Sequence, residues 1–265
     1  MPGTARRNLT IAALLIIAVT IPLSAAATTI NVYLNNGNPT TTTVVTSNAT
    51  TIYINASAGD IINISGNSGG KNVFITGATT INLAAGTSIT GNVANSFDPA
   101  LQVPGGSSVN GGGSDVTITG ADNNNDFKYG GRGLGIPFDG SGNLTLTGTF
   151  GNITGGNATG ASSTGAEGIY VINGNLTISG TVGNITGGNA NHDGGNGILA
   201  ANAGSNVVIS GTVGNITSGN GGASGSCGIR AGGGVTISGR TSNISSGTKN
   251  SPGNFAYFPQ GNASA

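Results

Sequence analysis

The sequence is poor in the residues that most catalytic and cofactor-binding sites use. Its 265 residues include no Trp, one Cys, one Met and one His, and only 6% are charged. The single Cys excludes an internal disulfide. Six basic and eight acidic side chains follow residue 27, so no basic patch for nucleic acid or anionic lipid is present. No catalytic signature and no cofactor motif rises above background.

Bulky apolar residues are scarce as well. Hydrophobic residues make up 36% of the chain, and 51 residues are Gly, so the apolar share is below that of an ordinary globular domain. Disordered chains share this deficit, but they are usually highly charged and poor in β-branched residues. Here Val and Ile occur in short alternating runs, which predicts a thin and regular β core.

Residues 1–27 have the features of an export signal. Arg6-Arg7 gives a positive start, the stretch from Leu9 to Leu23 is apolar, and Ala25-Ala26-Ala27 supplies a small-residue cleavage site. The apolar stretch is short for a membrane span and contains Pro22. We therefore expect a secreted or cell-surface protein whose mature chain has no membrane span.

One motif occurs four times in the second half of the chain. GTFGNIT at 148–154 returns as GTVGNIT at 180–186 and 211–217, and as GRTSNIS at 239–245, so the steps are almost constant. Such a period indicates one supersecondary unit stacked on copies of itself. The expected organisation is a single solenoid domain over 28–265, with tighter coils at 28–113, repeats of about 31 residues at 114–247 and a tail at 248–265.

Each repeat is predicted to contain three short strands and one long loop. Leu176 and Ile178 alternate with polar residues, as in a half-buried strand. Val182 and Ile185 are both apolar but separated by two positions, so a corner is needed between them. Gly183-Asn184 suits a corner because both residue types tolerate left-handed backbone angles. A third strand is expected at 168–171, 197–200 and 228–231. The fold class is therefore all-β, a parallel β-helix.

Upstream of the repeats the pattern is weaker. The segment from Val116 to Thr119 is similar to the one from Leu144 to Thr147 and lies about one repeat before it, so the two are predicted to occupy the same place in successive coils. The stretches 92–113 and 131–142 are predicted to be inserted loops.

The segment LTISGTVGNITGGN at 176–189, with its copies, resembles the right-handed parallel β-helix proteins of the pectate-lyase-like superfamily. It also resembles the Gly-rich TISG-type repeats of bacterial and archaeal surface proteins, an archaeal sheath or envelope protein being one candidate. The resemblance covers 114–247 well and 42–90 loosely. It implies a right-handed coil and an asparagine ladder at one corner, and it is specific for architecture rather than for activity.

Stacked coils place equivalent residues above one another. One expected interior ladder contains Leu144, Leu176, Val207 or Val208, and Val235; another contains Leu146, Ile178, Ile209 and Ile237. At the corner, we expect a structural asparagine ladder in which each side-chain amide bonds to the next. Its members are Asn152, Asn184, Asn215 and Asn243.

Two kinds of modification are considered. Asn-X-Ser/Thr sequons are only slightly more frequent than the composition predicts, and the corner asparagines are expected to be too enclosed for a glycan. The candidate glycosylation sites are therefore Asn48, Asn157 and Asn262. Cys227 has two interpretations, a small residue beside a strand or a thiol that links subunits.

Candidate ligand and catalytic groups are few. Glu167, Asp193 and His192 are the ionisable groups of the long repeat loops, and nothing sets the fixed gap that a pair of catalytic carboxylates requires. The run from Asp122 to Asp126 has the oxygen spacing of a calcium loop but lacks its glycine and distal Glu. We predict no catalytic, cofactor or metal site. A regular Thr face, considered for ice binding, contains Thr117, Thr119, Thr145, Thr147, Thr177, Ser179, Thr236 and Ser238.

The predicted function is structural. The ends of a solenoid are strand edges, which invite pairing with another chain, and the coils carry few charges that could block this. We expect an exported protein, without enzyme activity, whose copies assemble with one another into a cell-surface layer, sheath or filament. The alternative is an adhesin or carbohydrate-binding module that uses loops 155–167, 187–196 and 218–227, with cell-envelope glycans as partners.

Overall fold

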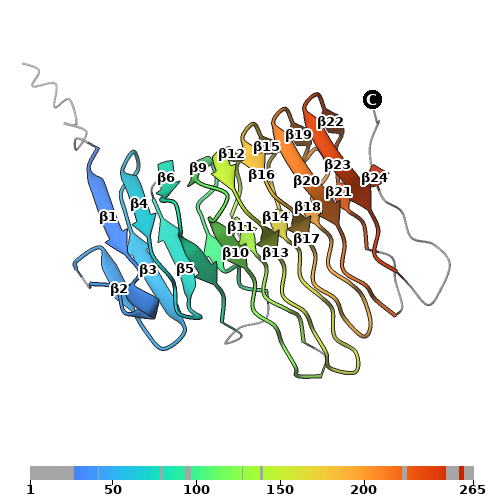
Figure 1. Ribbon diagram of the computed structural model, residues 1–265, viewed down its shortest axis with the longest axis horizontal. Coiled ribbons are helices and arrows are strands. Elements are labelled where there is room, and N and C mark those ends of the chain that lie inside the picture. Colours follow the sequence, from blue (N-terminus) through green and yellow to red (C-terminus); the bar gives the residue numbers. More distant parts are fainter. Residues whose placement is uncertain are drawn as a thin grey trace, which may run out of the picture.

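The computed structural model is a parallel β-solenoid of about seven coils. It describes residues 27–40, 42–77, 80–92, 97–126, 128–137, 140–222, 226–248 and 257–259. The coils follow the order of the sequence along the long axis, with β1 at one end and β22 to β24 at the other (Figure 1). The all-β, parallel solenoid fold predicted from the repeats is confirmed.

The strands form two sheets. The large sheet contains β1 (Thr29–Tyr33), β4 (Ile61–Ser65), β6 (Thr80–Leu83), β7 (Ser88–Thr90), β9 (Ser107–Gly112), β10 (Thr117–Thr119), β12 (Leu144–Phe150), β13 (Ile153–Thr154), β15 (Leu176–Ile178), β16 (Thr181–Val182), β17 (Ile185–Thr186), β19 (Val207–Ile209), β20 (Thr212–Thr217), β22 (Val235–Ile237) and β23 (Arg240–Ser245). The small sheet contains β2 (Val45–Ser47), β3 (Thr51–Asn55), β5 (Asn72–Thr76), β8 (Leu101–Gln102), β11 (Leu134–Gly135), β14 (Ile169–Val171), β18 (Ile198–Ala200), β21 (Ile229–Ala231) and β24 (Tyr257–Pro259). One short 3-10 turn, η1 (Asn35–Gly37), follows β1.

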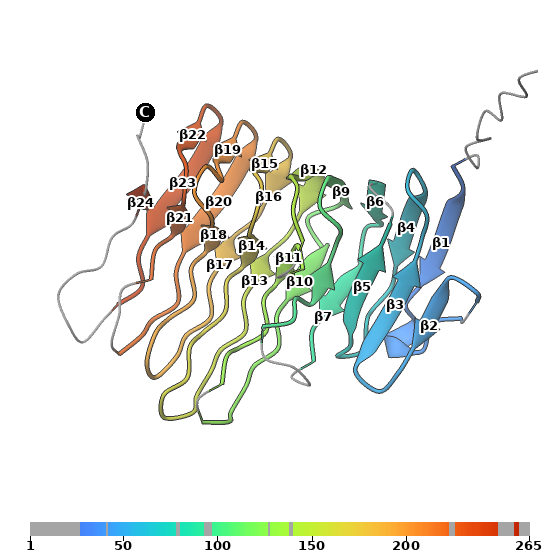
Figure 2. The same cartoon turned by 180° about the vertical axis from the view of Figure 1, so that it is seen from behind.

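Parallel pairing with the strand one coil later is the rule, and β2, which is antiparallel to β3, is the exception. Coil length varies along the chain. Ile62 pairs with Ile81, whereas Ile118 pairs with Ile153, so the later coil is much the longer of the two. The extra residues of the later coils lie in long loops that project from the same side of the solenoid (Figure 2).

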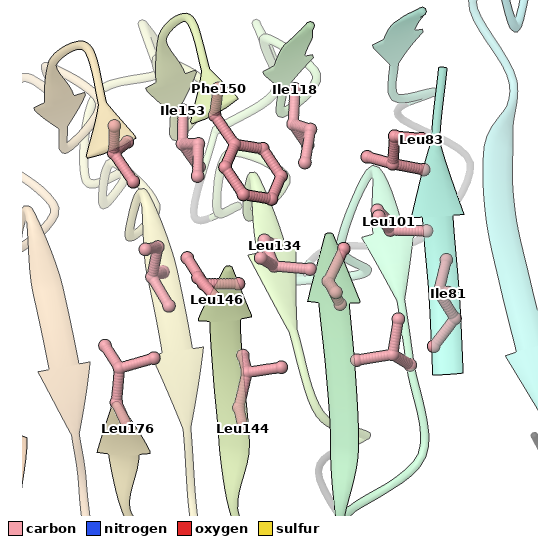
Figure 3. Close-up of a cluster of buried hydrophobic side chains, with 14 of the residues drawn as sticks. Ile81, Leu83, Leu101, Ile118, Leu134, Leu144, Leu146, Phe150, Ile153 and Leu176 are labelled. Carbon is pink, nitrogen blue, oxygen red and sulfur yellow. The ribbon is translucent and has the colours of Figure 1, made fainter. Parts of the chain in front are cut away.

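A single apolar core runs along the inside of the coils. Side chains from both sheets meet there, including Ile81, Leu101, Leu134 and Leu146 (Figure 3). Burial of one such side chain contributes about 1.5–3 kcal/mol to stability, and each coil places only a few such side chains in the core. The core is therefore stable only as a stack.

One interior ladder can be followed through the whole solenoid. Its members pair in register from coil to coil, and all are buried except the two terminal ones. Ile30 is half-buried and Ile237 is 40% exposed. In order, the ladder is Ile30, Ile62, Ile81, Val109, Leu146, Ile178, Ile209 and Ile237.

The neighbouring ladder of Leu144, Leu176 and Val235 includes Val207. Val208 is half-buried and points outward in the row of Thr177. Of the two alternatives that the sequence left open, Val207 is therefore the interior residue.

Both predicted inserted loops contain core strands, so that prediction is wrong. The stretch 92–113 includes β8 and β9, and 131–142 includes β11. Strand β9 has the sequence SSVNGG, in which Ser107 and Gly111 are buried where their strand partners Leu144 and Leu83 have large apolar side chains. Gly111 is required because a Cβ there would overlap the carbonyl oxygen of Thr149. The small residues remove the alternation from which a strand is recognised.

The predicted alignment of Val116 to Thr119 with Leu144 to Thr147 is also wrong. Ile118 pairs with Ile153, and the place before Leu144 is taken by Ser107 of β9. The spacing of the two similar segments is misleading because coils differ in length.

The corner at Gly183-Asn184 exists, but its predicted backbone conformation is wrong. Neither residue has a positive φ. Gly183 is needed for space, since a Cβ there would lie 2.8 Å from the carbonyl oxygen of Gly151 and 2.9 Å from Oδ1 of Asn152. Val182 and Ile185, on either side, are both buried, as the corner was expected to allow.

Candidate functional site: asparagine ladders and open coil ends

The predicted asparagine ladder lies at this corner. The backbone N–H of Asn184 donates to Oδ1 of Asn152, and that of Asn215 donates to Oδ1 of Asn184, each at 2.9 Å. Asn243 is the strand partner of Asn215. The bonds therefore join a backbone donor to a side-chain acceptor, rather than two side-chain amides. Asn152, Asn215 and Asn243 are exposed, so the corner does not enclose them.

A second ladder runs along the base of the long loops. Asn157 donates its N–H to Oδ1 of Asp122, Asn189 to Asn157, Asn220 to Asn189, and Thr248 to Asn220, at 2.7–2.8 Å. This ladder was missed from the sequence. Its signal was present, because GGN at 155–157 recurs at 187–189 and as SGN at 218–220.

Two more ladders complete the set. Asn175 donates its N–H to Oδ1 of Asn143, Asn206 to Asn175, and Gly234 to Asn206. On the outer face of the tighter coils, the side-chain amides themselves bond to one another, from Asn63 to Asn31, from Asn82 to Asn63 and from Asn110 to Asn82. The ladders hold successive coils in register on several sides.

A buried ion pair joins two coils near the middle of the molecule. Nε of Arg132 donates to Oε2 of Glu167 at 2.9 Å, and both side chains are at most 12% exposed. The guanidinium carbon lies 3.5 Å from the centre of the Tyr170 ring and 4.8 Å from that of Phe97. Phe97 in turn stacks on Tyr129. Burial raises the pKa of Tyr170. This cluster fastens the segment before β8 to the solenoid.

Glu167 and Asp193, which were considered as a catalytic pair, have different partners. Glu167 binds Arg132, whereas Oδ2 of Asp193 lies 3.0 Å from Nδ1 of His192. Each carboxylate is therefore engaged in its own ion pair or hydrogen bond.

The calcium-like run is also engaged with protein donors. Oδ1 of Asp122 accepts from Asn157, and Oδ1 of Asp126 accepts from the N–H of Ala161, each at 2.7 Å. In the part of the chain that the structure describes, no three His, Cys, Asp or Glu side chains are placed to hold a metal ion.

The candidate modification sites differ in exposure. Asn48 is exposed and accepts the N–H groups of Thr50 and Thr51, Asn157 is half-buried in the second ladder, and Asn262 lies outside the described residues. Cys227 is buried at 5% exposure, and desolvation raises the pKa of its thiol. A cross-link through Cys227 would require this part of the coil to open.

The predicted Thr face is not one surface. Thr145 and Thr177 are strand partners, with Val208 and Thr236 next in the row. Thr117 and its neighbour Thr119 pair instead with Ser88 and Thr90, in another row of the large sheet. The misalignment of β10 described above is the cause.

The two ends of the large sheet are strand edges. Among the described residues, β1 pairs with β4 alone, β22 with β19 alone and β23 with β20 alone. The ends of the small sheet carry β2 at one side and β24 at the other. Strands β1 and β22 contain no charged residue. These two edges are the candidate interaction sites of the molecule.

Backbone hydrogen bonds show which residues of each edge face outward. The carbonyl oxygen of Thr28 and the N–H of Leu34 bond to β4, each at 2.9 Å. Alternation along a strand then turns the backbone of Thr29 and Asn31 away from β4. At the other end, the N–H of Ser238 bonds to Ile209 at 3.0 Å, so the backbone of Ile237 faces outward.

No family model, no curated protein and no solved structure matches this chain. No segment of the described ranges forms a helix with the length and hydropathy that crossing a membrane requires.

Proposed function

We propose that the protein is an exported structural protein whose copies stack head to tail into a filament, layer or sheath at the cell surface. The observation that carries the proposal is the interior ladder that begins at Ile30 and ends at Ile237, with both terminal members partly exposed. Stacking one copy on the next would place Ile30 over Ile237 and bury both.

The backbone of the two edges is complementary in this register. In parallel pairing, a residue whose backbone faces the partner bonds to the two residues that flank its counterpart. Ile237 faces outward, and so do Thr29 and Asn31, which flank Ile30. The N–H of Asn31 would donate to the carbonyl of Ile237, and the N–H of Ile237 to the carbonyl of Thr29. This repeats the pairing found between successive coils inside the molecule.

Within the described ranges, the edge strands of the large sheet carry few of the features that usually prevent such pairing. Soluble proteins block open strands with charge, Pro, a bulge or a covering segment. On the large sheet, β1 and β22 are uncharged and Arg240 is the single charged residue of β23. The antiparallel β2 lies on the small sheet, so it does not cover β1.

Two matched pairs of variants test the proposal by electron microscopy and sedimentation of the secreted protein. Asn31→Pro removes the outward N–H, whereas Asn31→Ala keeps it and loses the same side chain. Ile237→Lys puts a charge at the open end of the core, whereas Thr236→Lys puts it on the outer face. We expect Asn31→Pro and Ile237→Lys to raise the critical concentration at least about tenfold, which corresponds to about 1.4 kcal/mol, and the controls to assemble.

Mixing the two blocked variants sharpens the test. Each retains one intact end, so an equimolar mixture should form dimers and stop there. Dispersed wild-type monomers at high concentration, or filaments that form equally well from Asn31→Pro, would overturn the proposal.

Glycan binding is the second candidate. An open groove of about 440 Å³ follows the second asparagine ladder and is lined by Asp122, Asn157, Asn189 and Asn220 among others. Regularly spaced amides suit a polymer of hydroxylated units. Retention on a glycan array by the monomeric Asn31→Pro variant, lost on Asn189→Ala, would favour this function. Polysaccharide turnover that disappears in Glu167→Gln or Asp193→Asn would instead favour an enzyme.

A further inference from the structure

Asp60 directly precedes β4 and lies beside the start of β1, and no cation pairs with its carboxylate among the described residues. Its exposure is 6%, and it takes part in neither of the ion pairs found among the described residues. Strands β1 and β4, which lie beside it, carry no charged residue, and Tyr33 is their single titratable side chain. A charge this well covered is ordinarily paired.

Thr28 is bound to this carboxylate twice. Its backbone N–H and its Oγ1 hydroxyl each donate to Oδ1 of Asp60 at 2.9 Å. The N–H of Ser57 donates to the other oxygen, Oδ2, at 2.8 Å. On its opposite side, the carbonyl of Thr28 accepts the N–H of Ile61 at 2.9 Å. Thr28 is therefore fixed at both its amino and its carbonyl group immediately before β1 begins.

The residue held in this way is also the first residue after the small-residue cleavage site Ala25-Ala26-Ala27. We propose that Asp60 is the acceptor for a new N-terminal ammonium group, created when an export peptidase hydrolyses the Ala27–Thr28 bond. Water adds to the carbonyl carbon of Ala27, the C–N bond breaks, and the products at neutral pH are the carboxylate of Ala27 and the ammonium of Thr28. The nitrogen that already donates to Asp60 then becomes its missing cation.

This pairing would secure the edge strand on which assembly depends. Before cleavage the carboxylate of Asp60 accepts from a neutral N–H group. After cleavage the donor carries a positive charge, and the added attraction between opposite charges strengthens the attachment of β1 to β4. The inference rests on the export step of the proposed function, and it does not depend on assembly.

The test uses the full chain, expressed in a secreting host and purified from the medium. Mass spectrometry is expected to find Thr28 as the first residue. The pKa of its amino group is then measured from the pH dependence of acylation. It should exceed the ordinary range of about 7.7–8.0, and acylation at pH 7 should be about tenfold slower than in Asp60→Asn if the shift is about one unit. Asp115→Asn, which removes an exposed carboxylate elsewhere, should behave as the wild type.

Three results would overturn the inference: a first residue other than Thr28, a retained leader, or equal acylation rates in the wild type and Asp60→Asn. If Asp60→Asn is not secreted, the acylation rate of the folded wild type is compared with that of the wild type unfolded in urea. Equal acylation rates in the two states again reject the pairing. Assembly is scored by microscopy on the same samples. If the protein begins at a slowly acylated Thr28 but stays dispersed, head-to-tail stacking is wrong and the pairing with Asp60 stands. If filaments form from a chain with another N terminus, the pairing is wrong and stacking stands.

Discussion

The backbone N–H of Asn184 donates to Oδ1 of Asn152 across 2.9 Å, one coil apart. The same bond continues from Asn215 to Asn184. Asn184 therefore binds its neighbours on both sides, through its N–H toward one coil and its side-chain oxygen toward the other. The ladder thus holds the corners of three coils in register, where Gly183 and Gly214 leave no side chain to do so.

Replacing the middle member tests this role. Asn184→Ala removes the acceptor for the N–H of Asn215 and should lower the free energy of unfolding by about 1 kcal/mol, the usual net value of one hydrogen bond. Asn184→Asp keeps an acceptor oxygen, as Asp122 does in the second ladder, and should lose much less. Urea denaturation, carried out in the Asn31→Pro background to keep the protein monomeric, measures the free energy of unfolding of both variants. Equal decreases in the two variants would show that the side-chain oxygen is unimportant.

The interior ladder gives a contrast between its middle and its end. Ile178 is fully buried, whereas Ile237 is 40% exposed. Ile178→Ala should cost about 2–5 kcal/mol through lost burial and a cavity. Ile237→Ala should cost well under half of that in the monomer, because water already reaches the side chain. Stacking of one copy on another would cover Ile237, so both variants are compared in the Asn31→Pro background, where stacking is blocked. Similar losses of stability in that background would mean that Ile237 is covered within the monomer.

The sequence was sufficient to place the corner asparagines and the last four members of the interior ladder, since GTVGNIT recurs with almost constant spacing. It predicted neither the ladder members from Ile30 to Val109 nor the bonds from backbone N–H groups to Oδ1 at the corner. It was insufficient where the repeat degenerates. Strand β9 fills interior positions with Ser107 and Gly111, so no apolar alternation marks it. Coil lengths also vary, as the pairings of β6 and β13 show, and this made the match of Val116 to Leu144 misleading.

Contacts between loops were beyond prediction for a related reason. Arg132 and Glu167 are separated by the same number of positions as Ile118 and Ile153, so the pair meets because that coil has this length. Thr28 and Asp60 likewise lie one coil apart, next to the pairing of β1 with β4. Neither pair can be predicted until the register of the coils is known. The signs of the charges alone do not show which of the few ionisable groups of this chain meet.

The buried ion pair should be among the most sensitive points of the structure. Arg132→Ala leaves the carboxylate of Glu167 without its cation and removes the contacts with Tyr170 and Phe97. Loss of one partner of a buried pair typically costs about 3–5 kcal/mol. Arg230→Ala, at an exposed position of β21, should change stability by no more than about 0.5 kcal/mol. Denaturant midpoints of the two variants decide the matter, and equal midpoints would show that the pair is dispensable.

Cys227 should be unreactive in the folded protein. Its thiol is 5% exposed, and desolvation raises its pKa, so little thiolate is present at neutral pH and reagents have no access. Labelling by a thiol reagent should become fast only in denaturant, and non-reducing electrophoresis of assembled material should show monomers. Rapid labelling under native conditions, or disulfide-linked dimers, would restore the hypothesis of a thiol that links subunits.

Tyr170 should make the protein sensitive to alkali. Burial raises the pKa of its phenol above the ordinary value of 10.0, Arg132 opposes this shift, and Glu167 adds to it. Because the folded-state pKa is the higher one, the stability linked to Tyr170 is fully present below about pH 10 and is lost as the pH rises through the folded value. Absorbance titration of phenolate in the wild type, compared with Tyr170→Phe, should show one tyrosine that ionises late and together with unfolding. Arg132→Ala should raise the pKa of Tyr170 further where the variant stays folded. A Tyr170 that titrates with the exposed tyrosines would mean that water enters between this ring and the guanidinium.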